Sequence, residues 1–167
     1  AFLADFLSPQ NQRANNWFGI RNRLGVSGGF KFMAHDFEHT FFNTTEDRTG
    51  PFTGPNYYPN FTYSNPMFLH QDLRNNVEYK MKWADGVHKH MFNNGALTQT
   101  EWNNRINGLA GIVDQVIVAE SARWGDAKVA TPKTRQTWIN AQNSILNSYL
   151  PVRGANVLAQ LRADGLY

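Results

Sequence analysis

The stretch that decides the fold is FKFMAHDFEHTFF, residues 30–42, in which aromatic and apolar residues lead into two acidic ones. Its period-2 alternation predicts a β-strand, where every second side chain points to the same face. Asp36 and Glu38 are two residues apart and would project from one face at the C-terminal end of that strand. Carboxylates placed in this way are candidate ligands for a hard cation such as Mg²⁺. The alternative interpretation makes them surface or loop-capping acids.

A second strand-like run precedes this stretch and predicts its partner. Residues 17–23, WFGIRNR, are joined to it by the glycine-rich connector LGVSGG, residues 24–29. Two such runs separated by a short glycine-rich connector predict an antiparallel β-hairpin. Folding about Val26 would pair residues whose numbers sum to roughly 53, so that Trp17 would lie opposite Asp36.

The predicted hairpin brings amides and carboxylates to one rim. Asn15 and Asn16 immediately precede Trp17, at the end of the hairpin where Asp36 and Glu38 are expected. In protein kinases an asparagine and an aspartate hold the Mg²⁺ of ATP in this manner. The pattern therefore favours a metal site at this rim, and a one-residue change of register would move these side chains to the opposite face.

Four segments of the sequence carry a further signal: NNWFGIRN at 15–22, GFKFMAHDFE at 29–38, AESARWGD at 119–126 and QLRADGLY at 160–167. Together they resemble the spore-coat CotH-type kinase family. The first two resemble that family's hairpin, whose second strand usually ends in a Trp-Asp-hydrophobic-Asp element. The last two resemble stretches of large bacterial surface proteins that contain this domain. The resemblance spans nearly all 167 residues.

The resemblance implies an atypical protein kinase that transfers phosphate from ATP to serine or threonine of a coat or surface protein. It implies that Asp36 is the metal ligand and that Asn16 is its amide partner. Asn15 would bind the cofactor beside Asn16, and Glu38 would be an auxiliary ligand or would orient the others. The implied cofactors are ATP with Mg²⁺ or Mn²⁺. The implied location is secreted or on the surface of a bacterial cell.

One residue departs from the family pattern and leaves the enzyme assignment open. Many members have an aspartate about five residues before the asparagine that corresponds to Asn16, as kinase catalytic loops do. This sequence has Asn11 at that place, and an amide cannot accept a proton as a general base. Catalysis stays open if another acid, such as Asp5 or Asp47, reaches the rim. Otherwise we expect a non-catalytic, pseudokinase-like module for cell-surface or coat interactions.

Composition fits one folded domain and excludes several classes of protein. The 167 residues are 41% hydrophobic and include 5 Trp, 6 Tyr and 12 Phe, which is ample for a core. The net charge is +3 and the basic residues are spread along the chain, so a nucleic-acid partner is not expected. The absence of cysteine excludes disulfides and thiolate chemistry. The sequence contains no apolar run of about 18 residues, so it predicts no membrane span.

The sequence is also expected to be a piece of a larger protein. A kinase needs an N-terminal lobe with a phosphate-binding lysine, and this sequence starts at Ala1, shortly before the segment that resembles a catalytic loop. We therefore expect the missing N-terminal part of the same protein to be a partner. A C-terminal lobe alone is expected to bind ATP weakly or not at all.

Residues 43–66 are expected to form an irregular aromatic loop, since their four prolines and two glycines prevent long helices. The tyrosines and phenylalanines of this loop are expected to pack onto the helices. The alternative, which is less favoured, is that they bind a peptide or a glycan, the latter as in a carbohydrate-binding module.

From Pro66 onward the pattern is helical, with the proline at the first helical position. One helix is expected to end at Asn93-Asn94-Gly95, and the next to begin with a capping box at Thr98 to Glu101 and to continue through Ile117. A third helix is expected to reach Tyr149 and a fourth to span 157–162. The apolar stripes expected to form the core include Val77, Met81, Val87, Ile106, Leu109, Ile112 and Val116.

Histidine spacing does not predict a metal site. His88 and His90 are two residues apart in a helical segment and would point to different faces, and His70 stands alone.

These patterns together predict an α+β fold that is mainly helical, with a small antiparallel hairpin followed by a helical bundle. Within one domain, residues 1–42 would form the catalytic-loop-like segment and hairpin, residues 43–66 the aromatic loop, and residues 67–167 the helical part. By resemblance, this is the arrangement of the C-terminal lobe of an atypical protein kinase.

Overall fold

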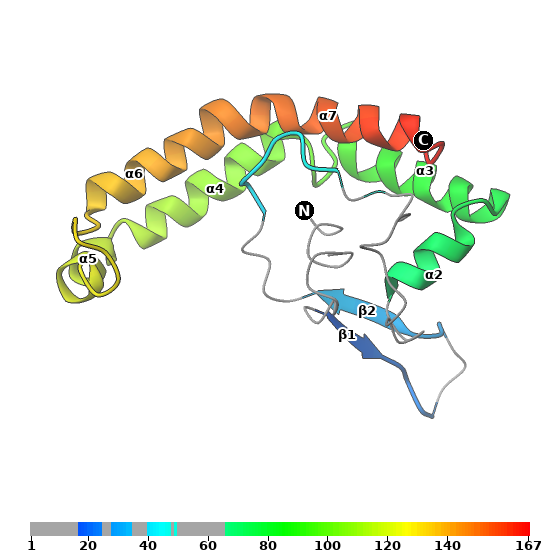
Figure 1. Cartoon of the computed structure of the whole chain (residues 1–167), viewed down its shortest axis with the longest axis horizontal. Coiled ribbons are helices and arrows are strands. Elements are labelled where there is room, and N and C mark those ends of the chain that lie inside the picture. Colours follow the sequence, from blue (N-terminus) through cyan, green and yellow to red (C-terminus); the bar gives the residue numbers. More distant parts are fainter. Residues whose placement is uncertain (1–16, 25–27, 35–39, 48, 50–65) are drawn as a thin grey trace. The chain divides into compact units, whose positions relative to one another are not determined.

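Figure 1 shows a computed structural model of the chain, which describes residues 17–24, 28–34, 40–47, 49 and 66–167. These residues are mainly helical, with a small two-stranded antiparallel sheet ahead of the helices, as the sequence predicted. The chain divides into two compact units. The first comprises Ala1–Ala84 and Val157–Tyr167, and the second comprises Asp85–Asn156.

The sheet of the first unit is the predicted hairpin. Strand β1, Trp17–Ile20, pairs antiparallel with strand β2, Lys31–Ala34. The predicted register was wrong by two residues, because Trp17 lies opposite Ala34 and not opposite Asp36. Gly29, in the connector, has a positive φ of 64°, a conformation that glycine adopts without steric cost.

Aromatic packing across the strands explains the observed register. Gly19 lies opposite Phe32, and the rings of Trp17, Phe30 and Phe32 lie 3.5–3.9 Å from where a Cβ of Gly19 would be. The rings of Trp17 and Phe32 meet edge to face with centroids 5.6 Å apart, an arrangement that aromatic pairs prefer. The small residue therefore makes room for rings from both strands.

Two helices follow in the first unit. Helix α2, Pro66–Leu73, begins at the proline, as predicted. Helix α3, Val77–Met91, begins after a short turn. The side chain of Asn76 accepts a hydrogen bond of 3.0 Å from the amide of Tyr79, so it caps an amide that has no partner within the helix.

The C-terminal end of helix α7, Leu150–Ala163, closes the first unit. Gly165 has a φ of 65°, and its amide bonds to the carbonyl of Arg162 while the amide of Leu166 bonds to that of Leu161. This pair of bonds is a Schellman motif. It folds Leu166 back beside Leu161, and both side chains are buried.

The second unit begins with the last residues of α3 and the turn after them. Asn93 and Asn94 have positive φ angles of 50° and 62°, and a Cβ on Gly95 would lie 2.4 Å from the carbonyl oxygen of Lys89. Helix α4, Gln99–Val113, starts after Thr98, as predicted. The predicted capping box does not form, because the Thr98 hydroxyl donates to the carbonyl of Gly95 instead.

Helix α4 does not continue through Ile117 as expected. It ends at Val113, and the short helix α5, Ile117–Trp124, starts after a turn. Helix α6, Arg135–Ser144, then begins with a capping box between Thr134 and Thr137. Arg135 makes a bidentate ion pair with Asp114, with N···O distances of 2.6 and 2.8 Å, and so links the start of α6 to the end of α4.

The expected third and fourth helices are continuous with each other. Helix α6 passes into a π-helical turn, Ile145–Tyr149, and then into α7. A proline inside an α-helix clashes with the carbonyl four residues before it, and Pro151 lies just beyond this turn. In the wider turn the Leu150 amide bonds to the carbonyl of Ile145, five residues back. The π-turn lets the helix continue past the proline.

Only part of each predicted apolar stripe is buried. In the second unit the core includes Val87, Ile106, Tyr149 and Leu150. Leu109 and Ile112, expected on the same buried stripe as Ile106, are 63% and 67% exposed, and Val77, Met81 and Val116 are exposed as well, so that part of the prediction was wrong. Periodicity shows which residues share a helix face but not how much of that face other elements cover. Among the described helices, none is both long and apolar enough to cross a membrane.

Candidate functional site

The residues predicted to bind metal and nucleotide lie outside the described residues. They are Asn11, Asn15, Asn16, Asp36 and Glu38. Residues 50–65 of the predicted aromatic loop lie outside them as well. The structure does describe the ladder pair nearest to these residues in sequence, Trp17 with Ala34.

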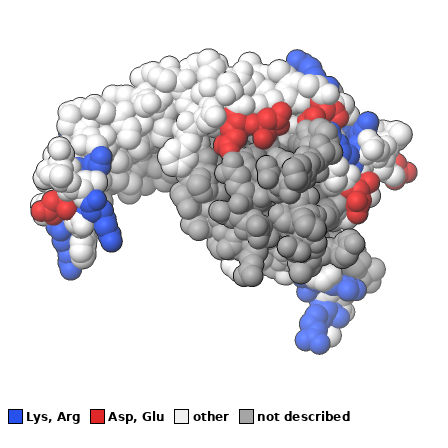
Figure 2. Space-filling view, viewed as in Figure 1, with Lys and Arg blue, Asp and Glu red and all other residues white. Residues whose placement is uncertain are grey.

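The opposite end of the hairpin is basic and exposed. Arg21, Arg23 and Lys31 are exposed there, and residues 17–34 contain no acidic residue. Figure 2 shows Lys and Arg side chains gathered at this end. The guanidinium of Arg21 lies over the ring of Phe30, 5.8 Å from its centroid, which is a cation–π distance.

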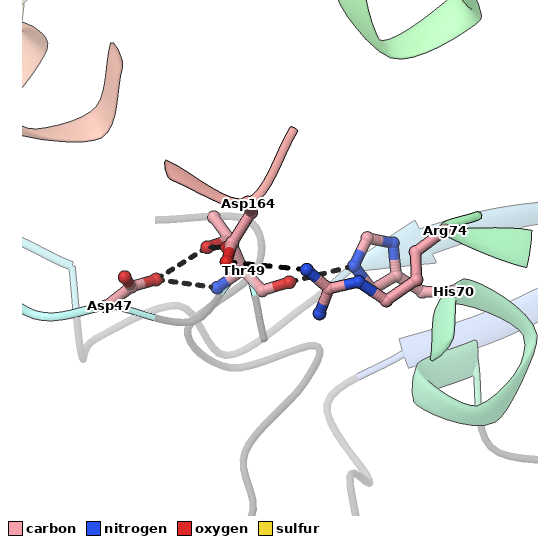
Figure 3. A network of polar contacts seen from close by, with 5 residues as sticks. All are labelled: Asp47, Thr49, His70, Arg74 and Asp164. Carbon is pink, nitrogen blue, oxygen red and sulfur yellow. Dashed lines mark hydrogen bonds and ion pairs between the residues drawn. The ribbon is translucent and has the colours of Figure 1, made fainter. Parts of the chain in front are cut away.

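The first unit also contains a buried polar network, which we call the clasp. It joins three parts of the chain that are far apart in sequence: the segment after the hairpin, helix α2 and the C-terminal end of α7. Thr49, His70 and Arg74 are 3%, 4% and 8% exposed. The clasp, drawn in Figure 3, consists of Asp47, Thr49, His70, Arg74 and Asp164.

Thr49 lies at the centre of the clasp. Its amide and its hydroxyl donate to Oδ1 of Asp47, at 2.9 and 2.7 Å. Its hydroxyl also contacts Oδ2 of Asp164. The other carboxylate oxygen of Asp164 pairs with Nη2 of Arg74 at 3.4 Å. The Asp164 carboxylate therefore connects the threonine to a buried cation in the turn after α2.

His70 connects Thr49 to helices α2 and α3. Its Nε2 is 3.0 Å from the carbonyl oxygen of Thr49, and its Nδ1 is 2.8 Å from the hydroxyl of Tyr79. The ring also meets the ring of Trp83 edge to face, with centroids 5.4 Å apart. Burial lowers the pKa of His70, with the hydrogen bond to the Thr49 carbonyl acting in the opposite direction.

Gln160 adds a second attachment for the same segment. Its side-chain amide donates to the carbonyls of Thr45 and Glu46, at 2.9 and 3.3 Å. Residues 45–47 and Thr49, which we call the anchored segment, are therefore held from two sides: by α7 near its C-terminal end and by His70 of α2.

The geometry of the clasp does not form a nucleophile–base pair. His70 meets the carbonyl of Thr49 and not its hydroxyl, and both ring nitrogens have partners. Among the residues that the structure describes, no group of three or more His, Asp or Glu side chains could hold a metal ion. The contacts of Asp47 are those of a structural acid, which orients Thr49. The clasp is therefore suited to holding backbone segments together.

Sequence reasoning did not find the clasp. Thr49 and Asp164 are 115 residues apart, and His70 and Thr49 are 21 residues apart. No local spacing or motif links such positions, and no other histidine lies near His70 in the sequence to indicate a site there.

Comparisons with known proteins add no assignment: no family model, no curated protein and no solved structure matches this chain.

Proposed function

We propose that this chain forms the C-terminal lobe of a CotH-like protein kinase, which transfers phosphate from ATP to serine or threonine of a coat or surface protein. In this proposal Asp36 binds Mg²⁺ or Mn²⁺, and Asn16 supplies an amide oxygen. Asn15 helps to hold the nucleotide, and Glu38 supports the metal. Turnover requires a general base other than Asn11, because an amide does not accept protons.

The observation that carries the proposal is the pairing of Trp17 with Ala34. Asn16 directly precedes Trp17, and Asp36 follows Ala34 by two residues. The segments that flank an antiparallel ladder pair leave from the same end of a hairpin. The observed pairing therefore supports a site at this end of the hairpin, although the register differs from the one expected from the sequence.

Calorimetry with ATP tests the proposal directly. We expect ATP binding, strongest in a longer natural form of the chain, that requires Mg²⁺ or Mn²⁺, is lost in Asp36→Ala and is retained in Asp72→Asn. Asp72 is an exposed carboxylate on α2, so this control removes one negative charge outside the proposed site. Both variants should be compared in this chain and in any longer natural form of it. No metal-dependent binding by any form would overturn the proposal.

A second candidate function is a non-catalytic cell-surface or coat interaction module. The apolar side of the hairpin favours it, since Phe18, Ile20 and Met33 are 57%, 52% and 54% exposed and such patches often mark interaction sites. Asn11, in place of the expected aspartate, favours it as well. The calorimetric experiment separates the two candidates, because an interaction module does not need metal-dependent nucleotide binding. A glycan-binding role depends on the aromatic loop and would be independent of divalent metal.

A further inference from the structure

We propose that the clasp is an acid-sensitive lock, in which neutral His70 holds the anchored segment against α2 and α3 and a proton on His70 releases it. The inference stands on the contacts of His70, and it does not depend on the proposed kinase function. In the chain, the anchored segment follows Asp36 and Glu38.

The contacts of His70 determine which ring nitrogen carries the proton. The carbonyl oxygen of Thr49 can only accept a hydrogen bond, so Nε2 must donate to it across 3.0 Å. Neutral imidazole then has an acceptor at Nδ1, and the Tyr79 hydroxyl donates to it across 2.8 Å. In the neutral ring, both nitrogens are therefore satisfied when Nε2 is protonated and Nδ1 accepts.

A second proton would disturb this arrangement at Nδ1. Protonated Nδ1 is a donor, so Tyr79 would have to turn its own hydrogen away and accept instead. The Tyr79 hydrogen would then lose its acceptor at a half-buried position, and an unpaired polar group at such a position is unfavourable.

The charged groups around His70 act in both directions. Arg74, in the turn after α2, opposes a positive imidazole, and Asp164, just after α7, favours it. Asp164 is already occupied, because it pairs with Arg74 and contacts Thr49. Asp47 accepts a hydrogen bond from the Thr49 hydroxyl, on the side of Thr49 away from His70. Tyr79 of α3 is a titratable group in direct contact with the ring, and burial raises its pKa, which keeps it uncharged.

The direction of the effect follows from burial. Because burial lowers the pKa of His70 in the closed clasp, the open state takes up the proton at a higher pH than the closed state. Opening therefore becomes more favourable as the pH falls below the ordinary value of 6.5. One proton changes the opening equilibrium by up to about tenfold per pH unit.

Amide hydrogen exchange, followed by NMR between pH 7.5 and 5, tests the lock. The reporter is the amide of Thr49, which bonds to Asp47, expressed as a protection factor so that the pH dependence of intrinsic exchange is removed. We expect protection of Thr49 to fall by up to about tenfold per pH unit below pH 6.5 in the natural chain. The Trp138 amide, bonded to Thr134 in the second unit, should keep its protection.

Two variants make the test specific. His70→Gln can donate to Thr49 and accept from Tyr79 but does not titrate, so protection of Thr49 should not change with pH. His90→Gln removes an exposed histidine of α3 and should behave like the natural chain. Since Asp47 and Asp164 are present in both variants, a response that comes from carboxylates would appear in both. The same pH dependence in His70→Gln would overturn the proposal.

A measurement on the natural chain covers the case in which His70→Gln does not fold. Imidazole nitrogen shifts should show the Nε2–H tautomer of His70 at pH 7.5, and loss of Thr49 protection should follow the same pH curve as protonation of His70. Protonation of His70 with no loss of protection, or the Nδ1–H tautomer at pH 7.5, would contradict the lock.

Discussion

The imidazole of His70 and the carbonyl of Thr49 are joined by a hydrogen bond of 3.0 Å, although 21 residues separate them in the chain. A carbonyl can only accept, so this one contact sets the tautomer of the histidine. It also fixes the backbone at the point where the segment after the hairpin reaches the helices of the first unit. The polar contacts around this pair, and not an apolar core alone, hold the ends of the first unit together.

The stability of the natural chain should fall as the pH decreases below neutrality. Burial lowers the pKa of His70 relative to 6.5, so the unfolded chain binds this proton at a higher pH than the folded chain. The stabilisation is fully present above pH 6.5 and is lost as the pH falls toward the lowered value of the folded chain. The free energy of unfolding, measured with urea at several pH values, should decrease in this way in the natural chain. It should decrease less steeply in His70→Gln. A stability that rises as the pH falls would contradict this assignment.

Arg74 and Asp164 form an ion pair, so the effects of substituting them on the free energy of unfolding should not be additive. Their side chains are 9% and 11% exposed, and removing one partner leaves the other charge buried. We expect Asp164→Ala to lower the free energy of unfolding by about 3 kcal/mol. Arg74→Met should cost less, because Asp164 keeps its contact with Thr49. The loss of unfolding free energy in the double variant should be smaller than the sum of the two single losses, by at least about 1 kcal/mol. Additive losses in urea unfolding would show that the pair contributes no interaction of its own.

Two glycines of the second unit should respond oppositely to alanine. A Cβ on Gly125 would lie 2.4 Å from the carbonyl oxygens of Ser121 and Lys133, so Gly125→Ala should destabilise the chain by about 1–3 kcal/mol. Gly108 is an exposed residue of α4 with nothing within 4 Å of its would-be Cβ. Gly108→Ala should stabilise the chain by about 0.5–1 kcal/mol. Thermal or urea unfolding measures both, and equal effects would mean that the contact at Gly125 is not close.

The elements that the sequence predicted well are those with local signals. The glycine-rich connector and the alternating aromatic residues predicted the hairpin, and Pro66 marked the start of α2. Asn93-Asn94-Gly95 marked the end of α3, and there the asparagines, not the glycine, adopt the left-handed conformation. In each case a few adjacent residues determine the backbone.

The features that the sequence did not predict depend on contacts between distant residues. The register of the hairpin follows from rings of both strands packing over Gly19. The helix continues past Pro151 because a π-turn makes room for the proline. The clasp requires Thr49, His70 and Asp164 to meet in space. Periodicity and motifs contain no information about such pairings, and the predicted metal ligands stay predictions.

The central claim is that a metal and nucleotide bind at the end of the hairpin where Asn16 and Asp36 flank the Trp17–Ala34 pair. The most direct measurement uses Mn²⁺ with ATP, because this paramagnetic ion broadens NMR signals most strongly for the nearest nuclei. Each residue along a strand adds about 3.3 Å of distance. Among the amide signals of residues 17–24 and 28–34, we expect those of Trp17 and Ala34 to broaden most, those of Ile20 and Lys31 less and that of Leu24 least, with no gradient in Asp36→Ala. Equal broadening along the hairpin, or none at Trp17 and Ala34, would contradict the proposed site.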